Sequence, residues 1–241
     1  MMVARFFCSD PVPEAGEFLL PKAVAHHAVR VLRMRDGDAL MLFDGRGGEV
    51  EATLVKCGTQ WRAQTGVRHE VERESPLDLV LVQALAGADK MDWVVQKAVE
   101  LGVKRMVPVR AARSVMKLVG ERAEKRVAHW RQVAVSACEQ SGRNHVPEVS
   151  PVVDLRDYLA TEQGVRRLVL DPAEGQSLVE LGRPDGACHV LVGPEGGWSE
   201  DELDACRAAG CVGVTLGPRV LRTETAGLAT LSALQVLWGD F

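Results

Sequence analysis

The sequence predicts an α/β protein in two parts, a β-rich segment over residues 1–70 that forms a small barrel and a longer segment that forms a mostly parallel sheet. Two observations support this. Short alternating apolar runs separated by turn residues fill the first segment, which is typical of exposed antiparallel strands. After it, near-continuous apolar runs alternate with apolar residues at helical spacing, which is typical of buried parallel strands covered by helices on both faces.

The first segment contains a predicted hairpin. Apolar residues at 40–43 lead into the glycine-rich turn 44–48, and apolar and polar residues then alternate over 50–54. Residues 60–67 follow as another strand, and residues 23–32 place apolar side chains three apart, as in a short helix.

A charged stretch with few apolar residues ends the barrel, and we interpret residues 71–77 as a linker. Residues 78–241 then form the second domain. The predicted strands are 77–85, 105–109, 167–170, 189–192 and 212–216, and the predicted helices are 91–101, 127–141, 199–209 and 225–238.

Helix starts are marked by capping residues. Ser199, with Glu202 three residues on, forms a capping box. Thr223 or Thr225 is the predicted N-cap of the last helix, with Glu224 near its positive end. Arg222 is not explained in this way, because a cation is disfavoured at a helix N-terminus, and this favours a functional role. The helix is apolar nearly all round, which predicts burial in the core or in a subunit interface.

Two glycine-containing loops, residues 193–199 and 216–225, each connect a predicted strand to a predicted helix. In open α/β sheets ligands bind at the carboxyl ends of the strands, where such loops lie. A tight structural turn is the alternative explanation for each loop. Neither has the spacing of a phosphate-binding or dinucleotide-binding loop, which argues against a Rossmann-type enzyme for a small phosphorylated metabolite.

Composition narrows the class of protein. The net charge is -4, and no apolar run approaches the ~20 residues that span a bilayer, so we expect no membrane partner. The N-terminus lacks the pattern of a signal peptide. The six cysteines have neither zinc-ligand spacing nor a disulfide pattern, which predicts reduced thiols, a cytoplasmic location and no metal.

Charge is unevenly distributed along the chain. Residues 104–143 hold ten Lys and Arg against three Glu, a local charge of +7, so the remainder sums to -11. A solvated helix face is one explanation. A basic region also suits phosphate binding whatever the net charge of the protein. Arg greatly outnumbers Lys, and because Arg pairs with phosphate and stacks on bases, this favours RNA.

Several blocks in order resemble the RsmE-type ribosomal RNA methyltransferases of the SPOUT superfamily, over nearly the whole chain. The blocks are Arg5-Phe6-Phe7, Gln83-Ala84-Leu85, Lys90-Met91-Asp92, residues 96–103, Arg113-Ser114-Val115, Glu139 to Arg143, Gly193 to Gly197 and Leu221 to Ala226. Two departures are small: Trp198 stands where Phe is usual, and Ala112 where an acidic residue is usual.

This resemblance implies a PUA-like barrel followed by an α/β SPOUT domain with a trefoil knot, a homodimer, and S-adenosylmethionine as methyl donor. The implied donor-binding residues are Gly193, Glu195, Gly196, Leu216, Gly217, Leu221, Arg222 and Thr223. The implied activity is methylation of N3 of a uridine in 16S rRNA, within the small ribosomal subunit.

The chemistry of that reaction suggests further roles. Uracil N3 must lose its proton at or before attack, which calls for a base or for a cation that stabilises the anion. Arg222 is the expected cation, Glu224 the candidate base, and Arg5 a second positive charge. Arg113 and Arg143 are expected to contact the RNA backbone. The alternative is a non-catalytic RNA-binding or ribosome-assembly factor.

Overall fold

The computed structural model describes residues 3–241, which form two compact units. The first comprises the chain up to Glu74 together with Cys138–Val146, and the second comprises Ser75–Ala137 and Pro147–Phe241. The sequence prediction placed residues 138–146 in the second domain. They group with the first unit because they contact the segment that was predicted to be a linker.

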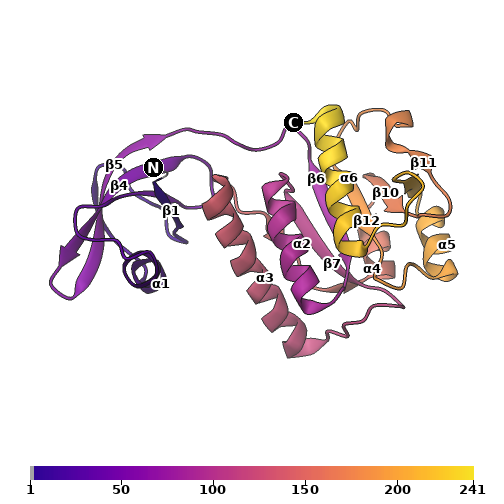
Figure 1. The fold of residues 1–241 in the computed structure, drawn as a ribbon, viewed down its shortest axis with the longest axis horizontal. Helices are drawn as coiled ribbons and strands as arrows, with labels where there is room; N and C mark the ends of the chain where they lie inside the picture. Colours follow the sequence, from indigo (N-terminus) through magenta and orange to yellow (C-terminus); the bar gives the residue numbers. More distant parts are fainter. Residues whose placement is uncertain (1–2) are drawn as a thin grey trace. The chain divides into compact units, whose positions relative to one another are not determined.

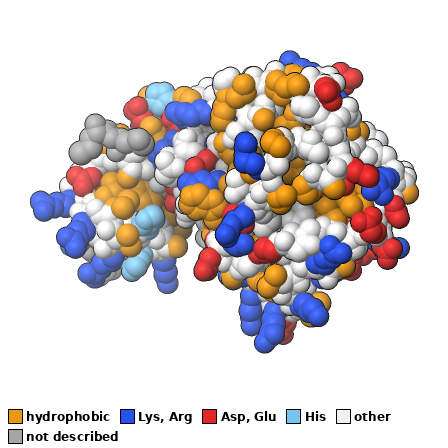
Figure 2. Space-filling model, turned by 45° about the vertical axis from the view of Figure 1, so that its right-hand side comes forward, with side chains coloured by type: hydrophobic (Ala, Val, Ile, Leu, Met, Phe, Trp, Pro, Cys, Tyr) orange, Lys and Arg blue, Asp and Glu red, His pale blue; other side chains and the backbone are white. Residues whose placement is uncertain are grey.

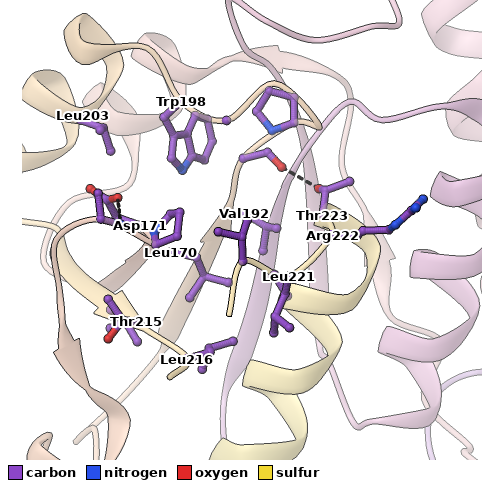
Figure 3. A pocket seen from close by; sticks show the side chains of 18 of the residues that line it. Leu170, Asp171, Val192, Trp198, Leu203, Thr215, Leu216, Leu221, Arg222 and Thr223 are labelled. Carbon is purple, nitrogen blue, oxygen red and sulfur yellow. Dashed lines mark hydrogen bonds between the residues drawn. The ribbon is translucent and has the colours of Figure 1, made fainter. Parts of the chain in front are cut away.

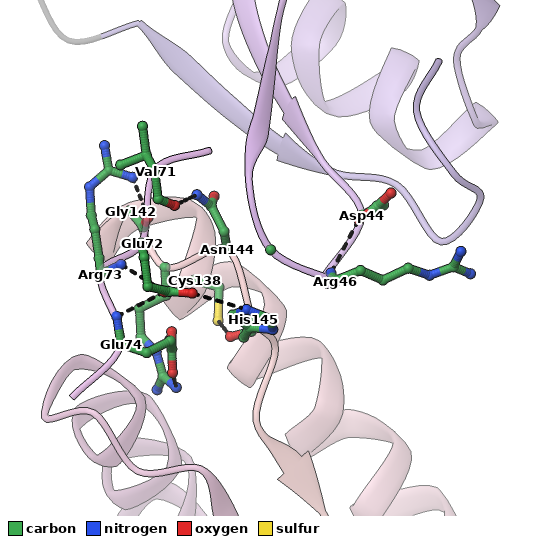
Figure 4. Close-up of polar contacts among 12 residues, drawn as sticks. Asp44, Arg46, Val71, Glu72, Arg73, Glu74, Cys138, Gly142, Asn144 and His145 are labelled. Carbon is green, nitrogen blue, oxygen red and sulfur yellow. Dashed lines mark hydrogen bonds and ion pairs between the residues drawn. The ribbon is translucent and has the colours of Figure 1, made fainter. Parts of the chain in front are cut away.

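Those contacts are shown in Figure 4. Asn144 donates to the carbonyl of Val71 over 2.9 Å, Arg73 donates to the carbonyl of Gly142 over 2.9 Å, and the His145 ring lies 3.2 Å from the Glu72 carboxylate. Residues 71–74 have no regular secondary structure. Hydrogen bonds and an ion pair to residues 142–145 hold them in place.

The first unit is built on a five-stranded sheet in the order β1-β3-β4-β5-β2. The strands are β1 (Ala4–Phe7), β2 (Gly16–Leu19), β3 (Ala39–Phe43), β4 (Glu49–Cys57) and β5 (Gln60–His69), with helix α1 (Lys22–His26) and a π-helical turn η1 (His27–Val31) between β2 and β3. Leu40, Leu42, Val50 and Leu54 are buried in its core. The predicted hairpin is confirmed, since β3 and β4 pair antiparallel across the glycine-rich turn.

The second unit contains an eight-stranded parallel sheet in the order β11-β13-β10-β12-β6-β7-β8, with β9 also paired to β7. Its strands are β6 (Leu79–Ala84), β7 (Arg105–Arg110), β8 (Glu148–Val149), β9 (Val153–Asp154), β10 (Arg166–Leu170), β11 (Gln176–Ser177), β12 (Cys188–Val192) and β13 (Val212–Thr215). Its helices are α2 (Ala88–Glu100), α3 (Gly120–Ser141, which continues into the first unit), α4 (Leu155–Thr161), the 3-10 turn η2 (Leu178–Glu180), α5 (Glu200–Ala208) and α6 (Thr223–Trp238).

Both faces of this sheet are covered. Val80 and Val82 point to the face where α4 and α5 pack, in one apolar cluster with Leu155 and Cys206. The opposite face carries Leu81, which lies against Gly227 of α6. Figure 1 shows α2 and α6 side by side over this second face. Every residue of β6 and β12 is buried, as the near-continuous apolar runs predicted.

The predicted fold class is therefore confirmed as a mixed sheet followed by a parallel α/β domain. The trefoil knot concerns how the chain threads, which strand order does not record, so it stays a prediction. All six cysteines are free, as predicted. Within residues 3–241 no helix has the length and apolar character needed to cross a bilayer. The structure also contains α4 and several two-residue strands that the sequence pattern did not predict.

Candidate functional site: a cavity between the glycine loops

A cavity of about 690 Å³ lies at the carboxyl ends of β10, β12 and β13, which are neighbours in the sheet. The loops that follow these strands form its walls (Figure 3). The structure brings all eight predicted donor-binding residues to this one cavity: Gly193, Glu195, Gly196, Leu216, Gly217, Leu221, Arg222 and Thr223. Three loops converge here because the parallel strands end at the same edge of the sheet.

Residues 170–174, the end of β10 and the loop after it, form one wall, and the sequence pattern gave no sign of this. Asp171 is 7% exposed and accepts a hydrogen bond from the backbone N–H of Ala173 over 2.9 Å. This loop has no distinctive spacing, and only its place beside β12 and β13 brings it to the site.

Close packing explains the glycines of the loop after β12. A Cβ atom on Gly193 would lie 3.2 Å from the indole ring of Trp198, and one on Gly196 would lie 3.1 Å from Cβ of Arg113. Trp198 is 7% exposed, and its buried Nε1 has no hydrogen-bond partner within residues 3–241. In Figure 3 this nitrogen faces the cavity. The cavity wall therefore carries an unused hydrogen-bond donor.

Helix α5 begins at this loop as predicted. Ser199 is its N-cap, and the capping box with Glu202 is formed in both directions. Glu202 also accepts a hydrogen bond from the backbone N–H of Ala112 over 2.7 Å. The next residue, Arg113, donates to the carbonyls of Gly196 and Trp198 over 3.0 and 3.1 Å. Arg113 thus holds the cavity loop, and its contact with RNA stays a prediction.

The predicted cap of α6 is wrong. The N-cap position is Arg222, and no side chain caps the helix. Thr223 instead donates to the carbonyl of Gly193 over 2.6 Å and accepts a hydrogen bond from Gln83 Nε2 over 2.9 Å. Thr223 is buried, so its hydroxyl satisfies a buried carbonyl rather than the helix end. It ties the two glycine loops together, and Gln83 is a residue that pattern reasoning missed.

Lys90 joins the same loops through a second set of contacts. Its Nζ lies 3.2 Å from Glu195 Oε1 and 3.3 Å from Glu224 Oε2. The backbone N–H of Gly87 also donates to Glu195 over 3.1 Å. We call Lys90, Glu195 and Glu224 the carboxylate clasp. The sequence blocks included Lys90 but gave it no role, because its two partners lie more than 100 residues away in the chain.

The contacts of the clasp shift the pKa values of Glu195 and Lys90. Partial burial works against the ionised form of Glu195, but hydrogen bonds from Gly87 and Lys90 outweigh burial and lower its pKa. Desolvation opposes the charge of Lys90 as well, and the two carboxylates still raise its pKa. Lys90 and Glu195 therefore stay charged near neutral pH.

The predicted catalytic and RNA-binding arginines differ in their surroundings. Arg222 is exposed at the cavity wall and makes no ion pair within the described residues 3–241. Arg5 is instead nearly buried in the first unit, where it pairs with Glu49, donates to Asn144 over 2.6 Å and lies over the Phe43 ring. Its charge is paired there, and the expected role of Arg5 as a second positive charge stays a prediction.

Arg143 is paired as well. Its side chain is 4% exposed and pairs with Glu74 inside the first unit. In this structure it joins chain segments of that unit, and its expected contact with an RNA backbone stays a prediction. No group of three or more His, Cys, Asp or Glu side chains that could hold a metal occurs among residues 3–241.

Two models of known protein domains match parts of this chain. An RNA methyltransferase domain model matches residues 73–235, and an RNA methyltransferase PUA domain model matches residues 20–58. Ribosomal RNA small subunit methyltransferase E of Bacillus subtilis is 34% identical, with 95% of each chain covered. The chain belongs to the ribosomal RNA small subunit methyltransferase E family. The Mycobacterium bovis member is also 34% identical, over 98% of this chain and 93% of that protein.

A solved structure supports the same assignment. Ribosomal RNA small subunit methyltransferase E from Neisseria gonorrhoeae, bound to S-adenosyl methionine, superposes with a TM-score of 0.93 at 38% identity and full coverage of both chains. The predicted family is thus confirmed, and so is the PUA-like character of the first unit. The roles of individual residues stay predictions.

Proposed function

We propose that this protein transfers a methyl group from S-adenosylmethionine to N3 of a uridine in 16S rRNA of the small ribosomal subunit. Family membership supports ribosomal RNA as the substrate, since the relatives are named for this activity. The observation that carries the proposal is the cavity in which both glycine loops and the start of α6 meet.

The residues of this cavity suit S-adenosylmethionine. A volume of about 690 Å³ falls within the range of ligand pockets, roughly 300–1,000 Å³. Glycines let the backbone approach a ligand closely. The Trp198 N–H, which has no hydrogen-bond partner within residues 3–241, offers a hydrogen bond to an acceptor, and Lys90 holds the glycine loop at Glu195 to the start of α6 at Glu224. When bound, this donor supplies an electrophilic methyl group on a sulfonium sulfur.

The protein must also deal with the N3 proton of uracil. Glu224 is the candidate base, and its carboxylate lies 3.3 Å from Lys90 Nζ. Arg222 lines the cavity at the start of α6 and forms no ion pair within residues 3–241, so we assign it the stabilisation of the developing uracil anion. Alignment of the methyl donor with N3 by the cavity walls supplies a further part of the rate.

The proposal includes a homodimer in the cytoplasm. On α6, Val236 is 66% exposed and Leu237 is 36% exposed, although this helix is apolar on nearly all sides. A second copy of the chain that packs on this face would cover them.

A methylation assay tests the function. Small ribosomal subunits that lack the modification are incubated with the protein and S-adenosylmethionine, and their nucleosides are analysed by mass spectrometry. We expect 3-methyluridine. A methyl group on another atom, or none, would overturn the proposal. The alternative, a non-catalytic RNA-binding or assembly factor, predicts no heat in a calorimetric titration with S-adenosylmethionine.

A further inference from the structure

A second concave surface lies in the same unit, away from the cavity. It has a volume of about 560 Å³ and is lined by Met116, Lys117, Leu118, Arg122, Lys125, Arg126 and His129. We call it the basic groove. Arg122, Lys125, Arg126 and His129 follow the spacing i, i+3, i+4 and i+7, so they form one stripe along the first turns of α3. Figure 2 shows Lys and Arg side chains gathered at the lower edge of the molecule, where α3 begins in Figure 1.

Three cations of the groove lack the partners that some other cations of the unit have. Arg105 pairs with Glu162, Arg110 pairs with Asp154, and Arg131 donates to the carbonyl of Val149. Within residues 3–241, by contrast, Lys117 and Arg126 form no ion pair, and the same is true of Arg122.

The nearby carboxylates do not neutralise the groove. Glu121 approaches Lys125 only at 3.8 Å, and both side chains are more than 80% exposed. Asp92 lies 2.8 Å from His129 at one end. No Asp or Glu belongs to the lining itself. Like charges gathered on one helix face destabilise the helix when nothing compensates them. The acids of these turns, Glu121 and Glu124, lie outside the lining, so the groove itself presents cations to an external anion.

The groove is connected to the cavity by a short segment. Arg113 holds the cavity loop through the carbonyls of Gly196 and Trp198, and Lys117 begins the groove four residues later. Four residues span at most about 13 Å. The stripe from Arg122 to His129 covers about 10 Å of helix axis.

We propose that the basic groove binds the sugar-phosphate backbone of the ribosomal RNA next to the nucleotide that enters the cavity. This inference rests on the proposed function and deepens it, because it assigns the substrate a track along α3 that neither glycine loop provides. The target base must leave its stack to reach the cavity, and phosphates held beside it would keep it extruded.

Salt dependence of RNA binding tests the groove. In Arg122→Gln/Arg126→Gln both side chains lose their charge and keep helix propensity. The matched control, Lys104→Gln/Arg183→Gln, removes the same charge from exposed positions outside the lining. Affinity for small ribosomal subunits, and for protein-free rRNA extracted from them, is measured from 50 to 200 mM salt.

Two lost contacts with single-stranded phosphate lower the slope of log affinity against log salt by about 1.4. Between 50 and 200 mM salt the wild-type protein should then lose about 7-fold more affinity than the groove variant. The control should keep the wild-type slope, and so should Arg122→Lys/Arg126→Lys. An unchanged slope in the groove variant, or an equal fall in the control, overturns the proposal. An effect on subunits without one on protein-free rRNA also overturns it, because the partner would then be a ribosomal protein.

The assay separates this inference from the proposed function. S-adenosylmethionine affinity should be unchanged in the groove variant, because neither Arg122 nor Arg126 lines the cavity. If the wild-type protein produces 3-methyluridine and the slopes do not differ, the groove fails while the function stands. If it produces none, the function fails, and the comparison of slopes still decides whether the groove binds RNA.

Discussion

The hydroxyl of Thr223 should stabilise the second unit, because it joins the two glycine loops of the cavity. Thr223→Val keeps the shape of the side chain and its β-branching but removes both hydrogen bonds, the 2.6 Å bond to Gly193 and the 2.9 Å bond from Gln83. Each bond contributes about 1 kcal/mol, and a buried carbonyl without a partner costs about 1–3 kcal/mol. Gln83 keeps its second acceptor, the carbonyl of Ala84. We therefore expect the free energy of unfolding of the second unit to fall by about 2–3 kcal/mol.

Urea unfolding followed by tryptophan fluorescence measures this loss, because four of the five tryptophans belong to the second unit. With an m-value of about 2–3 kcal/mol/M, the midpoint should shift down by about 1 M. Thr223→Ser keeps the hydroxyl and should lose much less. Thr225→Val is the matched control, since Thr225 is exposed in the same helical turn. If Thr223→Val unfolds at the same midpoint as Thr225→Val, the hydroxyl does not join the two loops and the reasoning is refuted.

Three further predictions follow from the site and its surroundings. Arg222→Ala should lower the methyl-transfer rate at least about 100-fold while S-adenosylmethionine still binds, and near-normal turnover would contradict its role. Lys90→Met should weaken donor affinity in calorimetric titration, because Glu195 then faces a second carboxylate without a counter-charge, whereas Lys90→Arg should retain it. Burial, with the charge of Arg105, lowers the pKa of His189 from 6.5 to about 4. The unfolded chain takes up this proton below pH 6.5 and the folded protein does not until about pH 4. The free energy of unfolding should thus fall by about 2 kcal/mol between pH 6.5 and 5, and this part should be missing in His189→Gln.

Local patterns were sufficient for the elements that frame the site. The near-continuous apolar runs located β6 and β12, and the capping box of Ser199 and Glu202 placed the start of α5. The two glycine loops identified the cavity, because parallel strands end at a common edge and a loop after such a strand must lie there. Period and capping chemistry are properties of neighbouring residues, which is why the sequence predicts them.

The sequence did not reveal the partners of two predicted site residues, Arg143 and Arg5. Arg143 looked like a phosphate ligand within a basic run, yet it is buried against Glu74, 69 residues away. Arg5 pairs with Glu49. Burial raises the pKa of the Glu49 carboxyl, but hydrogen bonds from Arg73 and Arg5 outweigh burial and lower this pKa below its usual value. Charge patterning along the chain cannot tell a solvated arginine from a paired one when the partner is distant in sequence.

The sequence by itself thus determined most of the longer strands and helices and the two loops, because each depends on residues close together in the chain, and the order of its blocks determined the family. Only the tertiary structure decided which polar groups are free to act. Thr223 leaves its helix end for Gly193, and Lys90 is bound by Glu195 and Glu224. Arg222 alone among the predicted catalytic residues keeps its charge unpaired within residues 3–241. The physical reason is that a buried polar group takes whichever partner the packed fold brings within reach, and sequence spacing does not record that distance.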